Sequence, residues 1–189
     1  MNDIAPVEEL HRGRFLRLLR VPFRKGHWEY VSRVNSSGAA FILAVTPQRE
    51  LLLVEQHRLP LGARTIELPA GMIGDEAAHR DEGIEASALR ELEEETGFAG
   101  AQARILLSGP VAAGLTSELL HLVEIRELTR VHAGGGVEGE DIVVHRVPLE
   151  AIDDWLARKR DEGLLIEPRI YTALYFLLRA ERGAFVGRA

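Results

Sequence analysis

Residues 67–98 read ELPAGMIGDEAAHRDEGIEASALRELEEETGF, and the second half of this stretch decides the fold. Apolar residues recur there at three- and four-residue spacing, namely Ile84, Ala88, Leu89 and Leu92. This spacing places them on one face of a helix. The pattern ends at Gly97, and glycine commonly follows the last residue of a helix. The sequence therefore predicts an amphipathic helix between Gly83 and Gly97.

The same helix carries an acidic face. Glu91, Glu94 and Glu95 fall within an arc of roughly 100°, beside the apolar stripe. Like charges at these spacings destabilise a helix by about 0.2–0.5 kcal/mol per pair, and the helix dipole disfavours anions in the last turn. A hard divalent cation such as Mg²⁺, which prefers oxygen ligands, would offset this repulsion. A glutamate run is also typical of a solvated helix face, so the helix alone leaves both interpretations open.

Aliphatic and alternating segments on both sides of this helix predict strands. Two of them, at 15–20 and 28–34, predict an N-terminal hairpin or meander with a turn near Pro22 and Gly26. Further strands are expected at 39–45, 51–55, 65–68, 103–108, 119–125 and 142–147. Two more helices are expected, one after Pro148 and one at 170–178. This order predicts an α/β (α+β) fold in which a mixed β-sheet is sandwiched between α-helices.

The length predicts one compact unit, because 189 residues fill one core but hardly two. Within it we distinguish an N-terminal β region at 1–36 from the main domain at 37–189. The chain has 29 acidic and 23 basic residues and a formal charge of −6, which argues against nucleic acid or a membrane surface as partner. It has no cysteine, no signal-peptide pattern and no apolar run long enough to span a bilayer. A cytoplasmic location is therefore expected.

The stretch from Glu67 to Phe98 resembles the Nudix box, the signature of the Nudix hydrolase family. The matching residues are Glu82, Arg90, Glu91, Leu92, Glu94, Glu95, Gly97 and Phe98. So many agreements at fixed spacing make a strong signal. One departure is the distance between Gly71 and Glu82, which is longer than usual in the family and predicts a lengthened loop. The resemblance implies the Nudix fold and a metal-dependent hydrolase.

Residues 67–71, ELPAG, resemble the lead-in of the ADP-ribose pyrophosphatase branch. This resemblance implies that the Ala70 carbonyl joins the acidic helix in holding two or three Mg²⁺ ions, with Mn²⁺ as the alternative. By the same similarity, Glu91 and Glu95 are the principal carboxylate ligands, and Glu94 is either an additional ligand or a residue that supports the ligands without contacting the metal. The resemblance also implies that Arg90 takes part in catalysis by orienting the helix and its carboxylates, and that Glu82 supports the same arrangement.

Residues 138–142, EGEDI, follow three glycines and resemble the mobile acidic loop of these enzymes. The resemblance implies that Glu140 is the catalytic base, with Glu138 as the rival. Glycines could act as a hinge that brings the base to the metals. A solvated acidic turn remains the alternative interpretation.

The resemblance also implies substrate contacts. Residues 28–33, WEYVSR, resemble the segment that clamps adenine, with Trp28 stacking and Arg33 hydrogen-bonding, often from the partner subunit of a homodimer. Arg58 would contact the diphosphate, and Glu67 would face the second sugar. The alternatives are core or dimer packing for Trp28 and a surface charge for Arg58. His57, His121 and His145 show no metal-binding spacing and are expected to be ordinary strand residues.

The implied reaction is Mg²⁺-dependent hydrolysis of ADP-ribose, a small-molecule substrate, to AMP and ribose 5-phosphate. Ala113 stands where the branch has a proline, which keeps GDP-mannose and other nucleoside diphosphate sugars open as substrates. A non-catalytic Nudix-like nucleotide sensor is the alternative from a different class.

Overall fold

The structure is a computed structural model that describes residues 6–36, 38–74, 80–137 and 139–182. At its centre lie two four-stranded sheets. One has the strand order β7 (Ala70–Ile73), β4 (Gly38–Ala44), β10 (Leu119–Arg126) and β9 (Gln102–Pro110). The other has the order β12 (Ile142–Pro148), β5 (Glu50–Arg58), β6 (Ala63–Glu67) and β13 (Leu165–Ile166). Both are mixed, because β10 runs parallel to β4 and β13 runs parallel to β6, whereas the other pairs are antiparallel.

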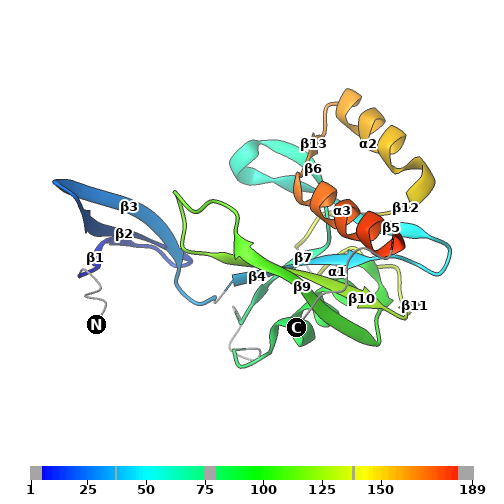
Figure 1. The fold of residues 1–189 in the computed structure, drawn as a ribbon, viewed down its shortest axis with the longest axis horizontal. Coiled ribbons are helices and arrows are strands. Elements are labelled where there is room, and N and C mark those ends of the chain that lie inside the picture. Colours follow the sequence, from blue (N-terminus) through cyan, green and yellow to red (C-terminus); the bar gives the residue numbers. More distant parts are fainter. Residues whose placement is uncertain (1–5, 37, 75–79, 138, 183–189) are drawn as a thin grey trace.

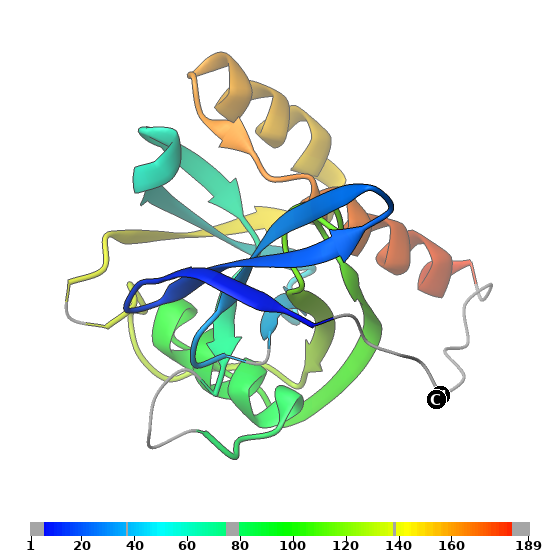
Figure 2. The same ribbon diagram turned by 90° about the vertical axis from the view of Figure 1, so that its left-hand side faces the viewer.

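Helices cover both faces of these strands. Alternate residues of β4 enter two separate cores: Phe41 and Leu43 join one, and Ala40, Ile42 and Ala44 join the other. The first core also takes residues of α2 (Ile152–Asp161) and α3 (Arg169–Glu181), and the second takes residues of α1 (Ile84–Thr96). In Figures 1 and 2, α2 and α3 accordingly lie on one side of the strands and α1 on the other. The predicted sheet between helices is confirmed, and burial on both faces explains the continuous aliphatic runs.

The first helix begins and ends where the sequence predicts. Gly83 precedes α1 with an extended backbone, and Gly97 follows it in the left-handed region at φ 74°. The N–H of Gly97 donates to the carbonyl oxygen of Glu93 at 2.8 Å. Residues Ala88 and Leu92 are fully buried, so the apolar stripe faces the sheet and the acidic face is left at its edge.

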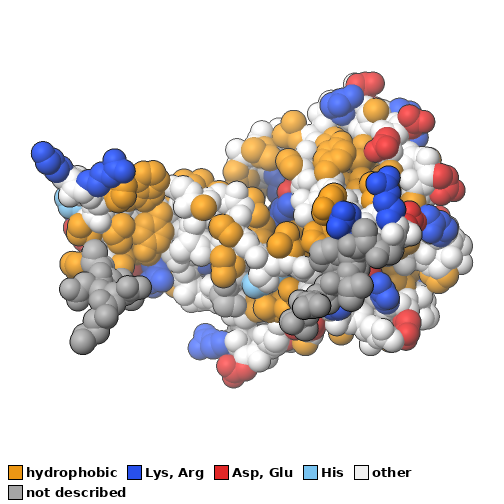
Figure 3. All heavy atoms as spheres, in the orientation of Figure 1, with side chains coloured by type: hydrophobic (Ala, Val, Ile, Leu, Met, Phe, Trp, Pro, Cys, Tyr) orange, Lys and Arg blue, Asp and Glu red, His pale blue; other side chains and the backbone are white. Residues whose placement is uncertain are grey.

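The N-terminal strands form a sheet of their own that extends away from the rest of the molecule (Figure 1). Its strands are β1 (Glu8–Arg12), β2 (Leu16–Phe23) and β3 (Gly26–Arg33), all antiparallel. The segment before β10 holds this sheet: the N–H of Val31 donates to the Leu115 carbonyl at 2.8 Å, and the N–H of Ser117 donates to the Val31 carbonyl at 3.3 Å. Figure 3 shows hydrophobic side chains gathered on the sheet.

Several local details differ from the sequence-based prediction. A single mixed sheet was expected, but the strands expected at 39–45 and 51–55 belong to two different sheets as β4 and β5, and the two segments meet in an isolated bridge between Val45 and Leu51. The turn of the first hairpin lies at 24–25, and Pro22 is inside β2. Its missing N–H is tolerated because β1 pairs with β2 only as far as Arg20.

Several short elements were not predicted: β1, β7, the pair β8 (Phe98–Ala99) and β11 (Thr129–Arg130), β13, and the 3-10 turn η1 (Leu59–Leu61). Most of them span too few residues to show a hydrophobic period. The helix expected after Pro148 begins as a 3-10 turn, η3 (Leu149–Ala151), and continues as α2. The loop predicted to be lengthened includes residues 75–79, which lie outside the described residues. In the part of the chain that the structure describes, no helix has the length and apolar character needed to cross a bilayer.

Candidate active site

The acidic face of α1 lies against β7. The N–H of Ala70 donates a hydrogen bond to Oε2 of Glu95 at 3.0 Å. A Cβ atom on Gly71 would lie 1.9 Å from Cδ of Glu91, so only glycine leaves room for that carboxylate. The structure thus brings Ala70, Glu91 and Glu95 into one cluster.

Arg90 links Glu91 of this cluster to two further carboxylates, those of Glu82 and Glu94. Its guanidinium lies 2.9 Å from Oε1 of Glu91 and 3.0 Å from Oε2 of Glu94, and it also donates to Glu82 at 3.2 Å. Burial lowers the pKa of Arg90, but the charges of these carboxylates outweigh it and raise the pKa above its ordinary value. Arg90 therefore offsets the like-charge repulsion that the sequence predicts and fixes the positions of the carboxylates.

The electrostatics of Glu95 favour a cation. Its side chain is buried, and burial, together with the charges of Glu91 and Glu140, raises its pKa to about 8 despite the hydrogen bond from Ala70. A divalent cation beside it would reverse this effect by favouring the carboxylate form.

The donor set for such an ion consists of carboxylate and carbonyl oxygens, which fits Mg²⁺ or Mn²⁺. Among the described residues, however, no three acidic, histidine or cysteine side chains already converge as a metal site. Glu91 and Glu94 lie within reach of Arg90 instead.

The three glycines before the acidic loop hold it against the end of α1. Gly135 donates its N–H to the carbonyl of Glu95 at 2.8 Å, and Gly136 donates to the carbonyl of Glu94 at 3.1 Å. This contact caps the helix and leaves Glu140 close enough for its charge to raise the pKa of Glu95. The carboxylate of Glu140 itself accepts the N–H of Val137 at 3.0 Å.

The rival base, Glu138, lies outside the described residues, so the choice between it and Glu140 stays a prediction.

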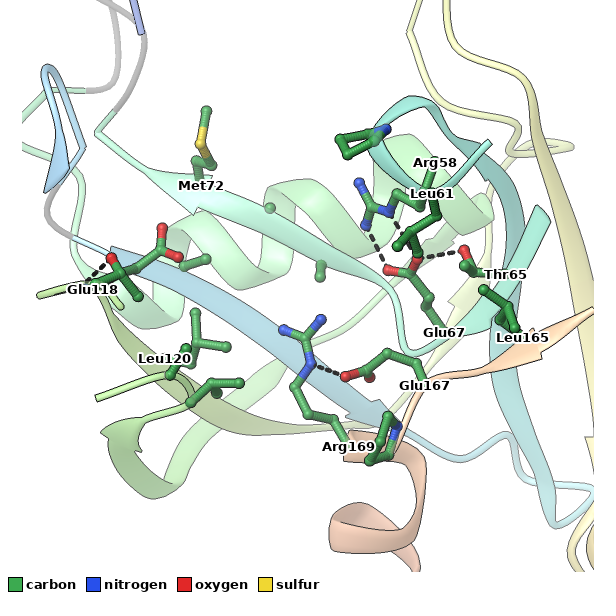
Figure 4. Close-up of a pocket in the computed structure, with 18 of the residues that line it drawn as sticks. Arg58, Leu61, Thr65, Glu67, Met72, Glu118, Leu120, Leu165, Glu167 and Arg169 are labelled. Atoms are coloured by element: carbon green, nitrogen blue, oxygen red, sulfur yellow. Dashed lines mark hydrogen bonds and ion pairs between the residues drawn. The ribbon is translucent and has the colours of Figure 1, made fainter. Parts of the chain in front are cut away.

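A pocket of about 620 Å³ adjoins the carboxylate cluster (Figure 4). Ala70 and Gly71 form part of its wall, and Arg58 and Glu67 form another part. Arg58 makes two hydrogen bonds to the buried carboxylate of Glu67, at 2.7 and 2.5 Å, and Thr65 donates a further one. Burial raises the pKa of Glu67, but the bonds from Arg58 and Thr65 outweigh it, and the pKa lies below its ordinary value. The ion pair thus presents a charged, fixed guanidinium edge to the pocket.

Of the two residues predicted to clamp adenine, only one lines the pocket. Arg33 lines the same pocket, where its guanidinium pairs with Glu118. Trp28 does not line it; the residue is 46% exposed on β3, and its Nε1 donates to the Gly114 carbonyl at 3.2 Å. In a single chain, therefore, Trp28 and Arg33 do not meet at one ligand-sized space.

Two pocket residues were missed by the sequence analysis. Glu167 and Arg169 flank Pro168 at the start of α3, pair with each other, and face the pocket opposite Arg58 (Figure 4). The Arg169 guanidinium also lies over the ring of Phe41, 5.4 Å from its centre. A signal was present in the sequence, since an arginine in the first turn of a helix opposes the helix dipole and calls for another role.

The family model described as the NUDIX domain matches residues 36–165. The methanol dehydrogenase activator of Bacillus methanolicus is 30% identical over 169 residues, which cover 87% of this chain and 83% of that protein.

Two relatives with named hydrolytic activities align over shorter parts. The ADP-ribose pyrophosphatase of Bacillus subtilis is 32% identical over 118 residues, covering 62% of this chain and 61% of that protein. The GDP-mannose pyrophosphatase of an Enterobacter species (strain 638) is 31% identical over 124 residues, covering 61% of this chain and 62% of that protein. The chain thus aligns with about three fifths of each of these two relatives.

Among solved structures, one titled "Crystal structure of ADP compounds hydrolase" superimposes with a TM-score of 0.70 over 95% of both chains, at 23% identity. At this identity the likeness establishes the fold.

Proposed function

Because the chain belongs to the Nudix family, we propose that it hydrolyses the pyrophosphate bond of a nucleoside diphosphate sugar, with ADP-ribose as the leading substrate. The observation that carries this proposal is the shared wall of Ala70 and Gly71, which contacts the carboxylates of α1 and lines the 620 Å³ pocket. A diphosphate in the pocket would lie beside that wall, within reach of the acidic cluster. The ADP-ribose pyrophosphatase among the relatives supports the choice of substrate.

We propose that Ala70, Glu91, Glu94 and Glu95 hold two or three divalent cations, Mg²⁺ or Mn²⁺. Such ions supply positive charge against the diphosphate and its leaving oxygen. Arg90 and Glu82 keep the carboxylates in place. The buried position of Glu95 supports this assignment, because an acidic side chain in such a place is costly without a charged partner.

The protein's own residues supply the other steps. Glu140 accepts a proton at its carboxylate from the attacking water, whose oxygen forms the new bond to phosphorus. The bridging oxygen leaves with the other phosphate, so that ADP-ribose yields AMP and ribose 5-phosphate. Arg58 and Arg169, on opposite sides of the pocket, bind the diphosphate or the second sugar, and Glu67 fixes Arg58.

We further propose a homodimer built through the 1–36 β region. Large hydrophobic side chains are exposed there, namely Phe15, Leu16, Phe23 and Trp28. An exposed apolar patch of this kind is typical of an interaction site. In a dimer, Trp28 would stack on the adenine in the partner's pocket, which fits its position outside the pocket of its own chain. The cytoplasmic location stays a prediction from the sequence.

The alternative substrate is GDP-mannose or another nucleoside diphosphate sugar. Two observations favour it: Ala113 replaces the proline of the ADP-ribose branch, and a GDP-mannose pyrophosphatase is among the relatives. Such a substrate needs the same metal cluster but different contacts to its nucleobase. A sensor that binds without cutting is the third outcome.

The deciding experiment is product analysis of the purified protein with Mg²⁺ and, separately, ADP-ribose and GDP-mannose. Release of AMP from ADP-ribose is expected; GMP alone would favour the alternative, and binding without cleavage would indicate a sensor.

Glu95→Gln and Glu140→Gln should each lower kcat by about 100-fold or more. Glu93→Gln is the matched control, because Glu93 lies exposed on the same helix. Near-normal turnover of Glu95→Gln at saturating Mg²⁺ would refute the metal assignment.

A further inference from the structure

A second pocket, of about 440 Å³, lies between the end of α1, the β8–β11 pair and β12. Within the part of the chain that the structure describes, it shares no lining residue with the substrate pocket. Two of the strands that line it, β11 and β12, lie on the side of the molecule away from the N-terminal sheet (Figure 1). It is therefore separate from both the proposed catalytic site and the proposed dimer surface.

The charge of this pocket is unusual for the protein. Arg130 and Arg146 line it, and no carboxylate of the described residues does, although the whole chain has a formal charge of −6. Arg146 is exposed, and its side chain has no hydrogen-bond or ion-pair partner among the described residues. Arg130 makes only a long bond, 3.3 Å, from Nε to the carbonyl of His132. Two guanidinium groups are thus available to an anion.

The other groups in the pocket do not oppose an anion. The carbonyls of Glu94 and Glu95 at the end of α1, which would repel it, already accept N–H groups from Gly136 and Gly135. The floor is apolar and includes the buried ring of Phe98 and the side chain of Ile142.

The remaining polar side chain, Thr96, is occupied by bonds to the Leu92 carbonyl and the Phe98 N–H. Polar recognition in the pocket therefore falls to the two arginines. A planar guanidinium matches the geometry of a phosphate group.

We propose that this pocket binds a phosphomonoester, with its phosphate held by Arg130 and Arg146 and its organic part against the apolar floor. The lining includes Gly134 and Gly135, which lead directly to the loop that carries Glu140. A bound phosphomonoester would therefore touch the segment that positions the proposed base. The site does not depend on the proposed reaction, although both products of that reaction are phosphomonoesters.

The test is calorimetric titration of metal-free protein, in the presence of EDTA, with inorganic phosphate and with ribose 5-phosphate. Amide NMR shifts of Gly134 and Gly135 locate the bound ligand. Arg130→Gln and Arg146→Gln should each weaken binding by about ten-fold, since each removes one charged contact. Arg158→Gln, an exposed arginine of α2, is the surface control, and Arg58→Gln is the control for the substrate pocket.

The proposal is supported if both ligands bind and only the two pocket variants lose affinity. Tighter binding of ribose 5-phosphate than of inorganic phosphate would identify the organic part as recognised, and equal binding would reduce the site to one for phosphate alone, contrary to the proposal. No binding at millimolar ligand, or equal loss in Arg58→Gln, would overturn it. Hydrolysis is measured in parallel, so that failure of this proposal can be distinguished from failure of the proposed function. An inactive protein can still bind phosphomonoesters in this pocket, and an active protein can fail to bind them.

Discussion

Gly71 sets the distance between β7 and the carboxylate of Glu91. A methyl group at this position would overlap Cδ of Glu91 at 1.9 Å, and that side chain can swing away because its end is flexible. We therefore expect Gly71→Ala to cost little free energy of unfolding but to lower kcat by roughly 10–100-fold, as when a metal ligand loses its orienting partner. Thermal unfolding and turnover at saturating Mg²⁺ measure the two effects.

The matched control is Gly109→Ala, since a Cβ atom there would meet nothing within 4 Å. It should change neither quantity. If Gly71→Ala kept full activity, the Glu91 carboxylate would not need its present position, and its role as a ligand would have to be abandoned.

At the same scale, the sequence predicted the residues of the acidic cluster better than those of the substrate pocket. Glu91 and Glu95 belong to one helix, so their spacing alone places them together. Arg58 and Glu67 lie on neighbouring strands, and the resemblance supplied both without indicating that they pair. Arg169 comes from a distant segment that only the tertiary fold brings to the pocket. The sequence pattern therefore could not predict the contacts between residues that lie far apart in the chain.

At the scale of the element, the cap of α1 depends on a glycine that no other residue can replace. Gly134 has φ 77°, and a Cβ atom on it would lie 2.4 Å from the backbone carbon of Thr96. Backbone cannot move aside as a side chain can, so Gly134→Ala should lower the free energy of unfolding by about 2–4 kcal/mol. Urea denaturation measures this difference.

Gly163→Ala separates the overlap from the backbone strain. Gly163 also has a positive φ, 92°, but a Cβ atom there would contact nothing within 4 Å. Its substitution should cost only about 1 kcal/mol. Equal losses in the two variants would mean that the packing of the glycine run against α1 contributes nothing.

A second prediction at this scale concerns Glu55, which joins β5 to β6, β12 and α2. Its carboxylate lies 2.7 Å from Arg64, 3.0 Å from His145 and 3.8 Å from Lys159. Burial alone would raise its pKa, but the bonds from His145 and Arg64 and the charge of Lys159 outweigh burial and lower it. Because the folded pKa is lowered, the stabilisation is complete above the unfolded pKa of about 4.3 and is lost as pH falls through the folded value.

Glu55→Gln should therefore lower the free energy of unfolding by about 1–3 kcal/mol at pH 7 and by much less at pH 3. Urea denaturation at the two pH values tests this, with Glu29→Gln, exposed on β3, as the control. A difference that stayed constant between the two pH values would exclude the charge of Glu55 as its cause.

At the scale of the whole molecule, the sequence predicted the fold correctly where a long segment showed a regular spacing of apolar residues. The helix from Ile84 to Thr96 and the sheet between helices are confirmed, as is the Nudix family itself. The sequence did not predict that β4 and β5 belong to two sheets. A strand buried on both faces is apolar throughout, so its sequence does not indicate which strand it pairs with. The boundary between 1–36 and the rest stays a prediction, although the first three strands do form a separate sheet.

The last prediction concerns assembly, and it follows from that separate sheet. A three-stranded sheet that extends from the body leaves apolar side chains in water, as the 64% exposure of Phe15 and the 47% exposure of Phe23 show. Pairing with a second copy would bury them. Sedimentation should therefore give twice the 21.0 kDa mass of the chain, and Phe15→Asp combined with Phe23→Asp should give the monomer. Leu178→Asp is the control, because Leu178 is 53% exposed on α3, away from the sheet.

The same variants link assembly to the substrate. If Trp28 of one chain stacks on the adenine bound by its partner, the monomer should show a KM raised roughly ten-fold, with kcat changed far less, because the carboxylate cluster lies within one chain. A monomeric wild-type protein would remove the dimer proposal. A dimer whose disruption left KM unchanged would instead keep the assembly and exclude Trp28 from the base contact.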